Sequence, residues 1–237
     1  MANLIVDIGN TAVKAAWAEG MTLGRTFRYQ GERIIEFILS LVERNRAEII
    51  VLSNVRKISP MKISRLESFC DRLVTVDKDI LEKYSLPSYV SPDRAASILA
   101  ARYLFKGCSC TICDFGTMLT TDFIDERGNY AGGCISPGCM TRFKSIHRYS
   151  KQLPLLDMPE ENDEKGLSIS SSICSGVISG IIFEIQGHIC QNSKNVTVFT
   201  GGDANYFAKR MKNSIFVVCN LVLMGLALIA TEINRNE

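Results

Sequence analysis

One short pattern occurs twice in this sequence, and it constrains the fold more than any other feature. LIVDIGNT (4–11) and TICDFGTM (111–118) both contain an apolar run, an aspartate, one intervening residue, a glycine, and a hydroxyl or amide residue. Asp7 and Asp114 occupy the same place in the two copies. We therefore expect two similar halves, with the repeated motif at equivalent points of a duplicated fold.

The segments that follow each copy are also alike. Short apolar runs flank a glycine-containing turn at 19–20 after the first copy and at 125–129 after the second, which is typical of β-hairpins. The pattern predicts an α/β protein in which each half, 1–90 and 91–237, is a mixed β-sheet with flanking helices around a central cleft. Further strands are expected at 48–53 and 195–202, and helices at 32–45, 60–73, 141–149, 170–192, 203–212 and 221–234.

Composition limits the class of protein. The 237 residues, of which 46% are hydrophobic and 22% charged, are ordinary for a globular protein with a buried core. A net charge of +2 without a basic cluster gives no reason to expect a nucleic acid as partner. The nine cysteines are scattered, and no basic, apolar leader precedes them, so we expect reduced thiols in a cytoplasmic protein.

The segment CSCTIC, with Cys108, Cys110 and Cys113, fits two interpretations. The cysteines could bind zinc, or they could be small apolar residues of a buried strand, where free cysteine is common. No second ligand pair at zinc-finger spacing accompanies them. On a regular strand Cys113 would point away from the other two, so we expect all three to pack inside the second half without a metal.

The apolar run 215–231 could be mistaken for a membrane span. It is slightly short for one and contains Asn220. Val217 and Val218 favour the end of a strand, and Asn220 could then cap a buried helix that begins at Leu221. The sequence therefore favours a protein without a membrane span.

The two repeated turns are candidate phosphate sites. After a strand, the backbone N–H groups of Gly9, Asn10 and Thr11 could face an anion, Asp7 could hold Mg²⁺ through water, and Lys14 adds positive charge. A plain hairpin turn is the alternative for a single copy. Two such turns facing each other across a cleft could hold the β- and γ-phosphates of a nucleotide from both sides.

Two further segments carry candidate residues. FTGGDA (199–204) could offer a flat glycine surface to an adenine or a ribose, or Asp203 could simply cap a helix. In SPDR (91–94), Pro92 begins a helix and Asp93 lies in its first turn, where it complements the helix dipole. Arg94 does not complement the dipole, so it could serve a ligand carboxylate, and Asp93 could accept a proton from a substrate hydroxyl.

No GxxxxGK[ST] motif is present, and the DFG at 114–116 lacks the catalytic loop of a protein kinase, so neither of those classes fits. The order of the motifs present resembles the type III pantothenate kinases of the acetate kinase, sugar kinase and actin superfamily. The matching segments are DIGNT with Lys14, Tyr84 to Arg94, DFGTMLT (114–120), GGCISPG (132–138) and TGGDA (200–204).

The resemblance implies a duplicated actin-like (ribonuclease H-like) fold and specific roles. Asp93 would be the proton acceptor for the primary hydroxyl of pantothenate, and Asp114 would hold K⁺ or NH₄⁺ and, with Asp7, lie near Mg²⁺. The family works as a homodimer in which a residue of the second subunit closes the substrate pocket. The implied ATP-binding residues are Asp7, Ile8, Gly9, Asn10, Thr11, Ala12, Val13, Lys14 and Thr117, and the implied pantothenate-binding residues are Tyr84, Ser91, Pro92, Asp93, Arg94 and Ile169.

Several positions depart from the family pattern, all on the pantothenate side. Ser91 replaces a glycine, Ser97 an asparagine, and Ile169 a substrate-binding threonine that Ser168 or Ser170 could replace. The expected reaction is transfer of phosphate from ATP to pantothenate, the first step towards coenzyme A. Two alternatives are a non-catalytic nucleotide-binding regulatory protein on the same fold and a kinase of another small alcohol.

Overall fold

A computed structural model describes residues 2–43 and 45–235 of the chain, which form two compact units. Unit 1 contains the described residues up to Leu104 together with those from Asn220 onward, and unit 2 is Phe105–Cys219. The sequence predicted a boundary at 90/91 instead. The division differs because helices α4 (Pro92–Leu104) and α8 (Leu221–Arg235) pack on each other and on the sheet of unit 1.

Unit 1 is built on a five-stranded sheet in the order β3-β2-β1-β4-β5. Strand β1 is central and all six of its residues are buried, because helices cover both faces of the sheet. The pairs β1–β2 and β2–β3 are antiparallel, whereas β4 runs parallel to β1 and β5. The strands are β1 (Asn3–Ile8), β2 (Val13–Glu19), β3 (Thr22–Tyr29), β4 (Ala47–Asn54) and β5 (Cys70–Thr75).

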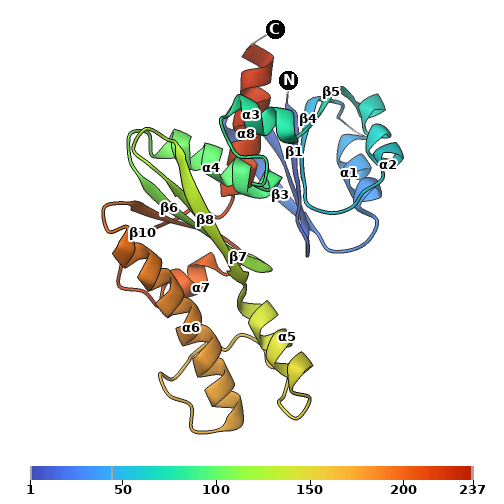
Figure 1. Cartoon of the computed structure of the whole chain (residues 1–237). Coiled ribbons are helices and arrows are strands. Elements are labelled where there is room, and N and C mark those ends of the chain that lie inside the picture. Colours follow the sequence, from blue (N-terminus) through green and yellow to red (C-terminus); the bar gives the residue numbers. More distant parts are fainter. Residues whose placement is uncertain (1, 44, 236–237) are drawn as a thin grey trace. The chain divides into compact units, whose positions relative to one another are not determined.

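Two hydrophobic clusters form the core of unit 1, one on each face of the sheet. On one face, Leu4 and Val6 of β1 pack with Ile38 of α1 (Ile34–Val42), beside the short helix α2 (Pro60–Ser64). On the other face, Ile5 packs with Leu226 of α8 and with residues of α4. Figure 1 shows α1 and α2 on one side of the strands and α4 and α8 on the other. Helix α3 (Lys78–Lys83) completes the unit.

Unit 2 repeats the topology of unit 1. Its sheet has the order β10-β9-β6-β7-β8, so the first strand of the unit is again central, with a hairpin pair on one side and two parallel strands on the other. This confirms the predicted duplicated α/β fold. The strands are β6 (Cys110–Phe115), β7 (Met118–Ile124), β8 (Tyr130–Pro137), β9 (Val196–Gly201) and β10 (Ile215–Val217).

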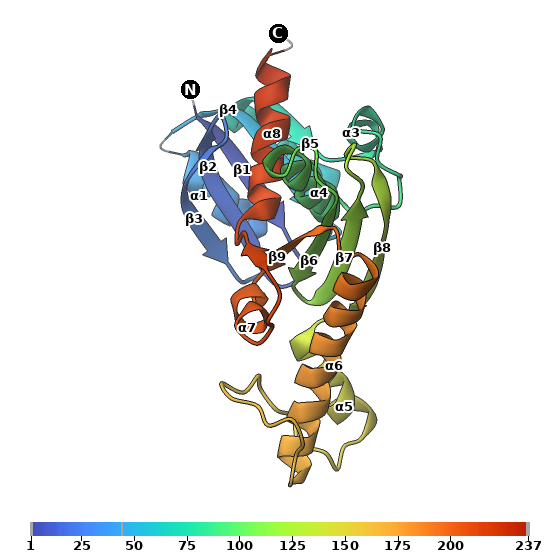
Figure 2. The same ribbon diagram turned by 90° about the vertical axis from the view of Figure 1, so that its left-hand side faces the viewer.

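Three helices share one apolar cluster with the sheet of unit 2: α5 (Cys139–Tyr149), α6 (Ile169–Gln191) and α7 (Ala204–Ala208). Figure 2 shows these helices below the strands of the sheet. Phe115 of β6 stacks on Phe207 of α7, with ring centroids 5.0 Å apart. A polar network also links β8, α5 and α6: Ser136 Oγ donates to Glu184 Oε1 at 2.6 Å, and Arg142 donates to the same serine and forms an ion pair with Glu184.

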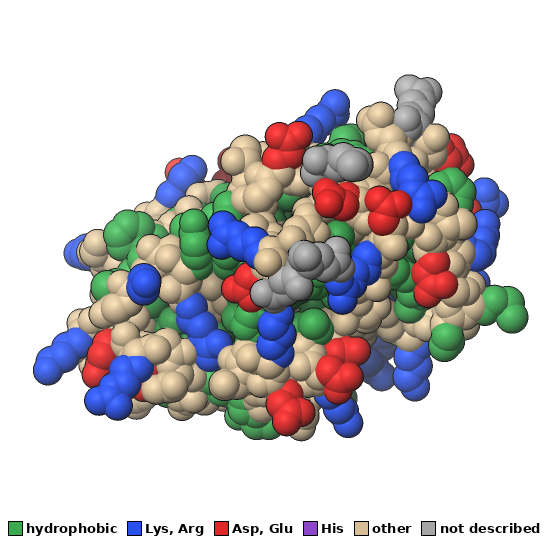
Figure 3. Space-filling model, turned by 90° about the horizontal axis from the view of Figure 1, so that it is seen from above, with side chains coloured by type: hydrophobic (Ala, Val, Ile, Leu, Met, Phe, Trp, Pro, Cys, Tyr) green, Lys and Arg blue, Asp and Glu red, His purple; other side chains and the backbone are tan. Residues whose placement is uncertain are grey.

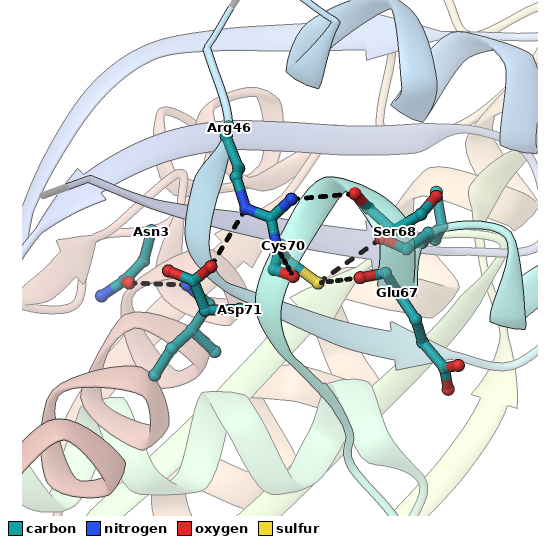
Figure 4. A network of polar contacts seen from close by, with 8 residues as sticks. Asn3, Arg46, Glu67, Ser68, Cys70 and Asp71 are labelled. Carbon is teal, nitrogen blue, oxygen red and sulfur yellow. Dashed lines mark hydrogen bonds and ion pairs between the residues drawn. The ribbon is translucent and has the colours of Figure 1, made fainter.

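The region between β4 and α4 is where the expected elements were wrong. The helix predicted at 60–73 ends at Ser64, and the chain then enters a short 3₁₀ turn and strand β5. Figure 4 shows what holds this strand start: Arg46 donates to Asp71 Oδ1 at 3.0 Å and to the carbonyls of Ser68 and Cys70 at 3.0 and 2.8 Å. Strand β5 also depends on its parallel pairing with β4, which no local sequence pattern reveals.

The apolar run 215–231 is divided between two elements, as the sequence predicted. Its first part is the short strand β10 of unit 2, and its last part is α8, most of whose residues are buried in unit 1. The Met224 N–H donates to the Asn220 carbonyl, while the Asn220 side chain donates to Thr26 Oγ1 at 3.3 Å. Asn220 therefore begins the helix through its backbone, and its side chain anchors the helix start to β3.

Candidate active site

The first turn, residues 9–12, joins β1 to β2. The Gly9 N–H donates to the Ala12 carbonyl at 3.1 Å, which closes the hairpin. That N–H is therefore used within the turn and is not available to an anion, contrary to the prediction for Gly9. Asn10 and Thr11 are exposed at the tip, where a nucleotide phosphate could reach them.

Asp7 is the centre of a polar row across the end of the unit 1 sheet. The registers place Lys14 and then Arg28 beside it on one side and Ser53 on the other, so the four side chains share one face. Asp7 is 8% exposed and Ser53 is fully buried. Ser53 Oγ has no hydrogen-bond partner among the described residues, which marks a place where a polar ligand or water would be stabilised.

The second turn, residues 116–118, joins β6 to β7 in the same way. The Gly116 N–H donates to the Met118 carbonyl at 3.2 Å. The Thr117 carbonyl accepts hydrogen bonds from Gly138 N at 3.1 Å and Thr141 Oγ1 at 2.6 Å, so the start of α5 supports the turn. A Cβ at Gly138 would lie 2.1 Å from the Gly116 carbonyl oxygen, so only glycine allows this approach.

Asp114 lies at the end of β6 beside a glycine that leaves it room. Gly201 has φ +94°, and a Cβ there would lie 2.5 Å from Asp114 Oδ1. The glycine of the predicted TGGDA motif is therefore required by backbone conformation and by the space that the carboxylate occupies. Asp203 follows at the start of α7 without a side-chain capping bond, and burial raises the pKa of its carboxyl above the usual 3.8.

The start of α4 fixes the carboxylate of Asp93. Asp93 Oδ1 accepts hydrogen bonds from Ser91 Oγ at 2.5 Å and from Arg94 N at 2.9 Å. The Ser91 carbonyl accepts from the Ala95 N–H, so Ser91 stands where a helix cap does. One oxygen of the carboxylate, Oδ1, is thus held by the chain, which restricts the orientation of the side chain. Arg94 is buried, with 7% exposed.

Comparison with known proteins decides the family. The family model for type III pantothenate kinases matches residues 3–191. The chain belongs to the type III pantothenate kinase family. A member from Flavobacterium johnsoniae is 34% identical over 233 residues, covering 94% of this chain and 95% of that protein. Another from Cytophaga hutchinsonii is 35% identical over 233 residues, covering 94% and 96%.

Solved structures agree on the fold alone, because their identities are low. A Baf-family protein from Campylobacter jejuni aligns with a TM-score of 0.69 at 22% identity over 99% of this chain and 100% of its own. The activator of the 2-hydroxyisocaproyl-CoA dehydratase from Clostridium difficile, solved with ADPNP bound, has a TM-score of 0.58 at 13% identity over 100% and 96%. The apo form of the ParM protein of pSK41 has a TM-score of 0.53 at 11% identity over 99% and 98%. These neighbours confirm an actin-like fold.

Tyr84 is hydrogen-bonded to the C-terminal helix. It follows α3, and its hydroxyl donates to Glu232 Oε2 of α8 at 2.5 Å. Burial, and then the hydrogen bond to the neighbouring carboxylate, raise the pKa of Tyr84. Arg102 of α4 donates to the Tyr84 carbonyl at 2.8 Å. Three elements thus fix the position of the tyrosine that the sequence assigned to the pantothenate pocket.

The start of α6 separates the two serines that flank Ile169. Ser168 caps the helix, accepting a hydrogen bond from Ser171 N at 3.1 Å, while the Ser171 hydroxyl accepts from the Ser168 N–H. Ser170 is exposed and takes no part in this capping box, so it is the candidate whose hydroxyl could replace that of the threonine. Ile169 itself is 62% exposed.

The cysteines of CSCTIC do not behave as one group. Cys110 and Cys113 are fully buried on opposite faces of the regular strand β6, as predicted, whereas Cys108 precedes the strand and is exposed. The prediction that all three pack inside was wrong for Cys108, because the strand begins only at Cys110. Burial raises the pKa of Cys110 to about 11 and that of Cys113 to about 12.

Two residues near the first turn escaped the sequence analysis. Ser53 lies in a strand and Arg56 just after it, and neither belongs to a recognisable motif. Only the pairing of β4 with β1 brings them to Asp7 and to the first turn. The analogous position of Thr200, in register with Asp114 in unit 2, is a signal that could have pointed to Ser53.

Proposed function

We propose that this chain transfers the γ-phosphate of ATP to the primary hydroxyl of pantothenate, giving 4′-phosphopantothenate and ADP in the first step of coenzyme A biosynthesis. Membership of the family supports the reaction class. The observation that carries the assignment of roles is the oriented carboxylate of Asp93 at the start of α4. A positioned carboxylate of this kind is suited to general-base catalysis.

In the proposed reaction, Asp93 accepts the proton of the substrate hydroxyl. The hydroxyl oxygen forms a bond to the γ-phosphorus, and the bond between that phosphorus and the oxygen bridging to the β-phosphate breaks, so that ADP leaves. The two donors hold Oδ1 of Asp93, so the proposed base is the other oxygen of the carboxylate, Oδ2. Tyr84, Ser91, Pro92, Arg94 and Ile169 are the proposed pantothenate-binding residues, as the sequence implied.

ATP is proposed to bind along residues 7–14 and at Thr117. The exposed tip of the first turn, with Lys14 beside Asp7, supports this placement. The Gly9 N–H is used within the turn, so the proposed contribution of Gly9 is to close the hairpin on the Ala12 carbonyl.

The residues present fit the cations that the family implies. Among the described residues, no cluster of three or more His, Cys, Asp or Glu could hold a metal, which suits an ion held by one carboxylate, waters and the phosphates of a nucleotide. Asp7 is the proposed Mg²⁺ residue, and it lies in register with Ser53, whose hydroxyl has no hydrogen-bond partner in the part of the chain that the structure describes. Asp114, in the space kept by Gly201, is the proposed K⁺ or NH₄⁺ residue. Bound Mg²⁺ would neutralise charge on the phosphates.

A homodimer in the cytoplasm is part of the proposal. By length and composition α6 could cross a membrane, and 28% of its most apolar window is buried. Its buried side belongs to the core of unit 2, so we assign it to a globular unit, and its exposed apolar side to a second copy of the chain. A hollow of about 410 Å³ lies between α5 and α6, lined in part by Ile146, Ile173 and Val177. Ile135, Leu167, Ile169 and Phe183 are exposed in the same unit.

The test of the reaction is Asp93→Asn. We expect kcat to fall by about 10²- to 10⁴-fold, because the positioned base is lost while the shape is kept. The affinity for ATP should stay within a few-fold, and Asp79→Asn, which changes an exposed aspartate in the first turn of α3, should leave kcat unchanged. Steady-state ADP release gives the kcat of both variants, and a direct binding measurement gives the affinity for ATP. A loss of kcat below tenfold for Asp93→Asn would remove Asp93 from the base role.

The same assay separates the substrate alternatives. With pantothenate, sugars and other small alcohols as acceptors, pantothenate should be phosphorylated at the highest kcat/KM. Turnover of another alcohol in its place would identify a different kinase of the same fold. Nucleotide binding without turnover of any acceptor would favour the regulatory alternative.

A further inference from the structure

The chain that leaves β4 folds back onto the first turn. The Val55 N–H donates to the Ile8 carbonyl at 3.2 Å, and the Arg56 N–H donates to Asn54 Oδ1 at 2.9 Å. Arg56 Nε then donates to the carbonyl of Gly9 at 2.7 Å. The arginine is thereby fixed against the backbone of the turn that is proposed to hold the phosphates of ATP.

The contact with Gly9 uses only one part of the guanidinium group. Among residues 2–43 and 45–235, neither Nη1 nor Nη2 of Arg56 has a hydrogen-bond acceptor or an ion-pair partner, although the side chain is half-buried. A guanidinium group is always charged, and its planar donors match the oxygens of a phosphate. A side chain that already lost freedom by binding Gly9 would pay less entropy on binding an anion.

The surroundings of the first turn favour an anion of high charge. Lys14 and Arg28 stand in one row with Asp7, so Arg56 adds a third basic residue where the row contains one carboxylate. A divalent cation at Asp7 would shift this balance further. The phosphates beyond the α-phosphate of a nucleotide carry most of its negative charge and would be attracted here.

We propose that Arg56 binds the β- or γ-phosphate of ATP through Nη1 and Nη2, while Nε holds the Gly9 carbonyl and with it the shape of the turn. This proposal rests on the proposed placement of ATP at residues 7–14. Arg56 thus adds a nucleotide-binding residue outside the motifs of the sequence. It would distinguish ATP and ADP from AMP, because AMP lacks the phosphates that it contacts.

The experiment measures the Kd of ATP, ADP and AMP for the wild-type chain, Arg56→Gln, Arg56→Lys and the control Lys57→Gln, with AMP read by competition. Lys57 is the next residue and is exposed, and within 2–43 and 45–235 no hydrogen bond or ion pair joins its side chain to the turn. For Arg56→Gln we expect the Kd of ATP to rise about 10- to 100-fold, as for the loss of a hydrogen bond to a charged group. The Kd of AMP should change less than threefold, and Lys57→Gln should bind all three as the wild type does.

The comparison of ADP with ATP identifies the phosphate. A rise for both nucleotides assigns the β-phosphate, and a rise for ATP alone assigns the γ-phosphate. Arg56→Lys keeps the positive charge but lacks the planar donors of the guanidinium group. Its loss of affinity for ATP should therefore be smaller than that of Arg56→Gln. An equal loss of affinity for AMP and ATP would overturn the proposal, because it would show that the role of Arg56 is confined to the shape of the turn. No loss of affinity for ATP would overturn it as well.

Failure of this proposal is distinguishable from failure of the ATP placement. Lys14→Gln, measured in parallel, should weaken the binding of ATP if the turn binds the phosphates. If Lys14→Gln weakens the binding of ATP and Arg56→Gln does not, only the proposed role of Arg56 is wrong. If neither does, the placement of ATP at residues 7–14 is wrong as well. A thermal unfolding midpoint of Arg56→Gln close to that of the wild type shows that the variant is folded.

Discussion

At the scale of single residues, burial decides the chemistry of the cysteines. Cys70, Cys110, Cys113 and Cys139 are buried, and burial raises the pKa of each thiol, to about 12 for Cys139. Because the thiolate is the reactive form, these four are inert at neutral pH. These four cysteines thus serve as small apolar residues of the core.

Alkylation of the native protein with iodoacetamide at pH 8 should therefore separate eight of the nine cysteines into two groups, because only Cys174 is half-buried. Peptide mass spectrometry should find rapid labelling of the exposed residues and slow labelling of the four buried ones, which react only after unfolding. The exposed cysteines are Cys108, Cys134, Cys190 and Cys219. Labelling of Cys113 as fast as Cys108 would show that strand β6 is not packed as described.

At the scale of elements, one close helix contact joins distant parts of unit 1. Gly225 of α8 lies against α4, where a Cβ would come within 1.8 Å of the Ala96 carbonyl oxygen. The neighbouring atoms are backbone and cannot move aside as a side chain would. Two helices that are far apart in the sequence can approach this closely only at a residue without a side chain.

Gly225→Ala should lower the free energy of unfolding by about 1–3 kcal/mol or more, through overpacking. The matched control is Gly187→Ala in α6, where nothing lies within 4 Å of an added Cβ. That change should stabilise the helix by up to about 1 kcal/mol, since alanine is the better helix former. Urea unfolding of both variants gives the comparison, and a neutral Gly225→Ala would contradict the close packing of α4 and α8.

At the scale of the whole molecule, the duplicated fold places the same feature in both units. The two units share one strand order, and each central strand delivers an aspartate, Asp7 or Asp114, to the end of its sheet beside a tight turn. Unit 2 also carries the apolar surface of α6 that we assign to a second copy. A surface of this kind is expected to be covered by a partner.

Light scattering should therefore give about twice the chain mass of 26.3 kDa. Phe183→Glu, which puts a charge on the exposed side of α6, should shift the protein to monomers and lower activity, because the substrate pocket is proposed to need both subunits. Met61→Glu changes another exposed apolar residue, in unit 1, and should leave the mass unchanged. An active wild-type monomer would remove the dimer from the proposal.

The sequence by itself determined the features that depend on local pattern. Residue periodicity and turn chemistry act over a few residues, and four features follow from them. These are the repeated turns, the hairpins after them, the helix that begins at Pro92 and the division of the apolar run 215–231. The five motifs were sufficient to identify the family. The roles of Asp93, Asp114 and the pocket residues remain proposals.

Only the tertiary structure decided what depends on pairing between distant segments. Strand β5 exists because β4 pairs with it, α8 returns to unit 1 because its apolar face fits α4, and the hydroxyl of Tyr84 is held by Glu232. Arg56 reaches Gly9 only because β4 lies beside β1. Such contacts are set by packing and register rather than by local propensity, so no short stretch of sequence contains the information that specifies them.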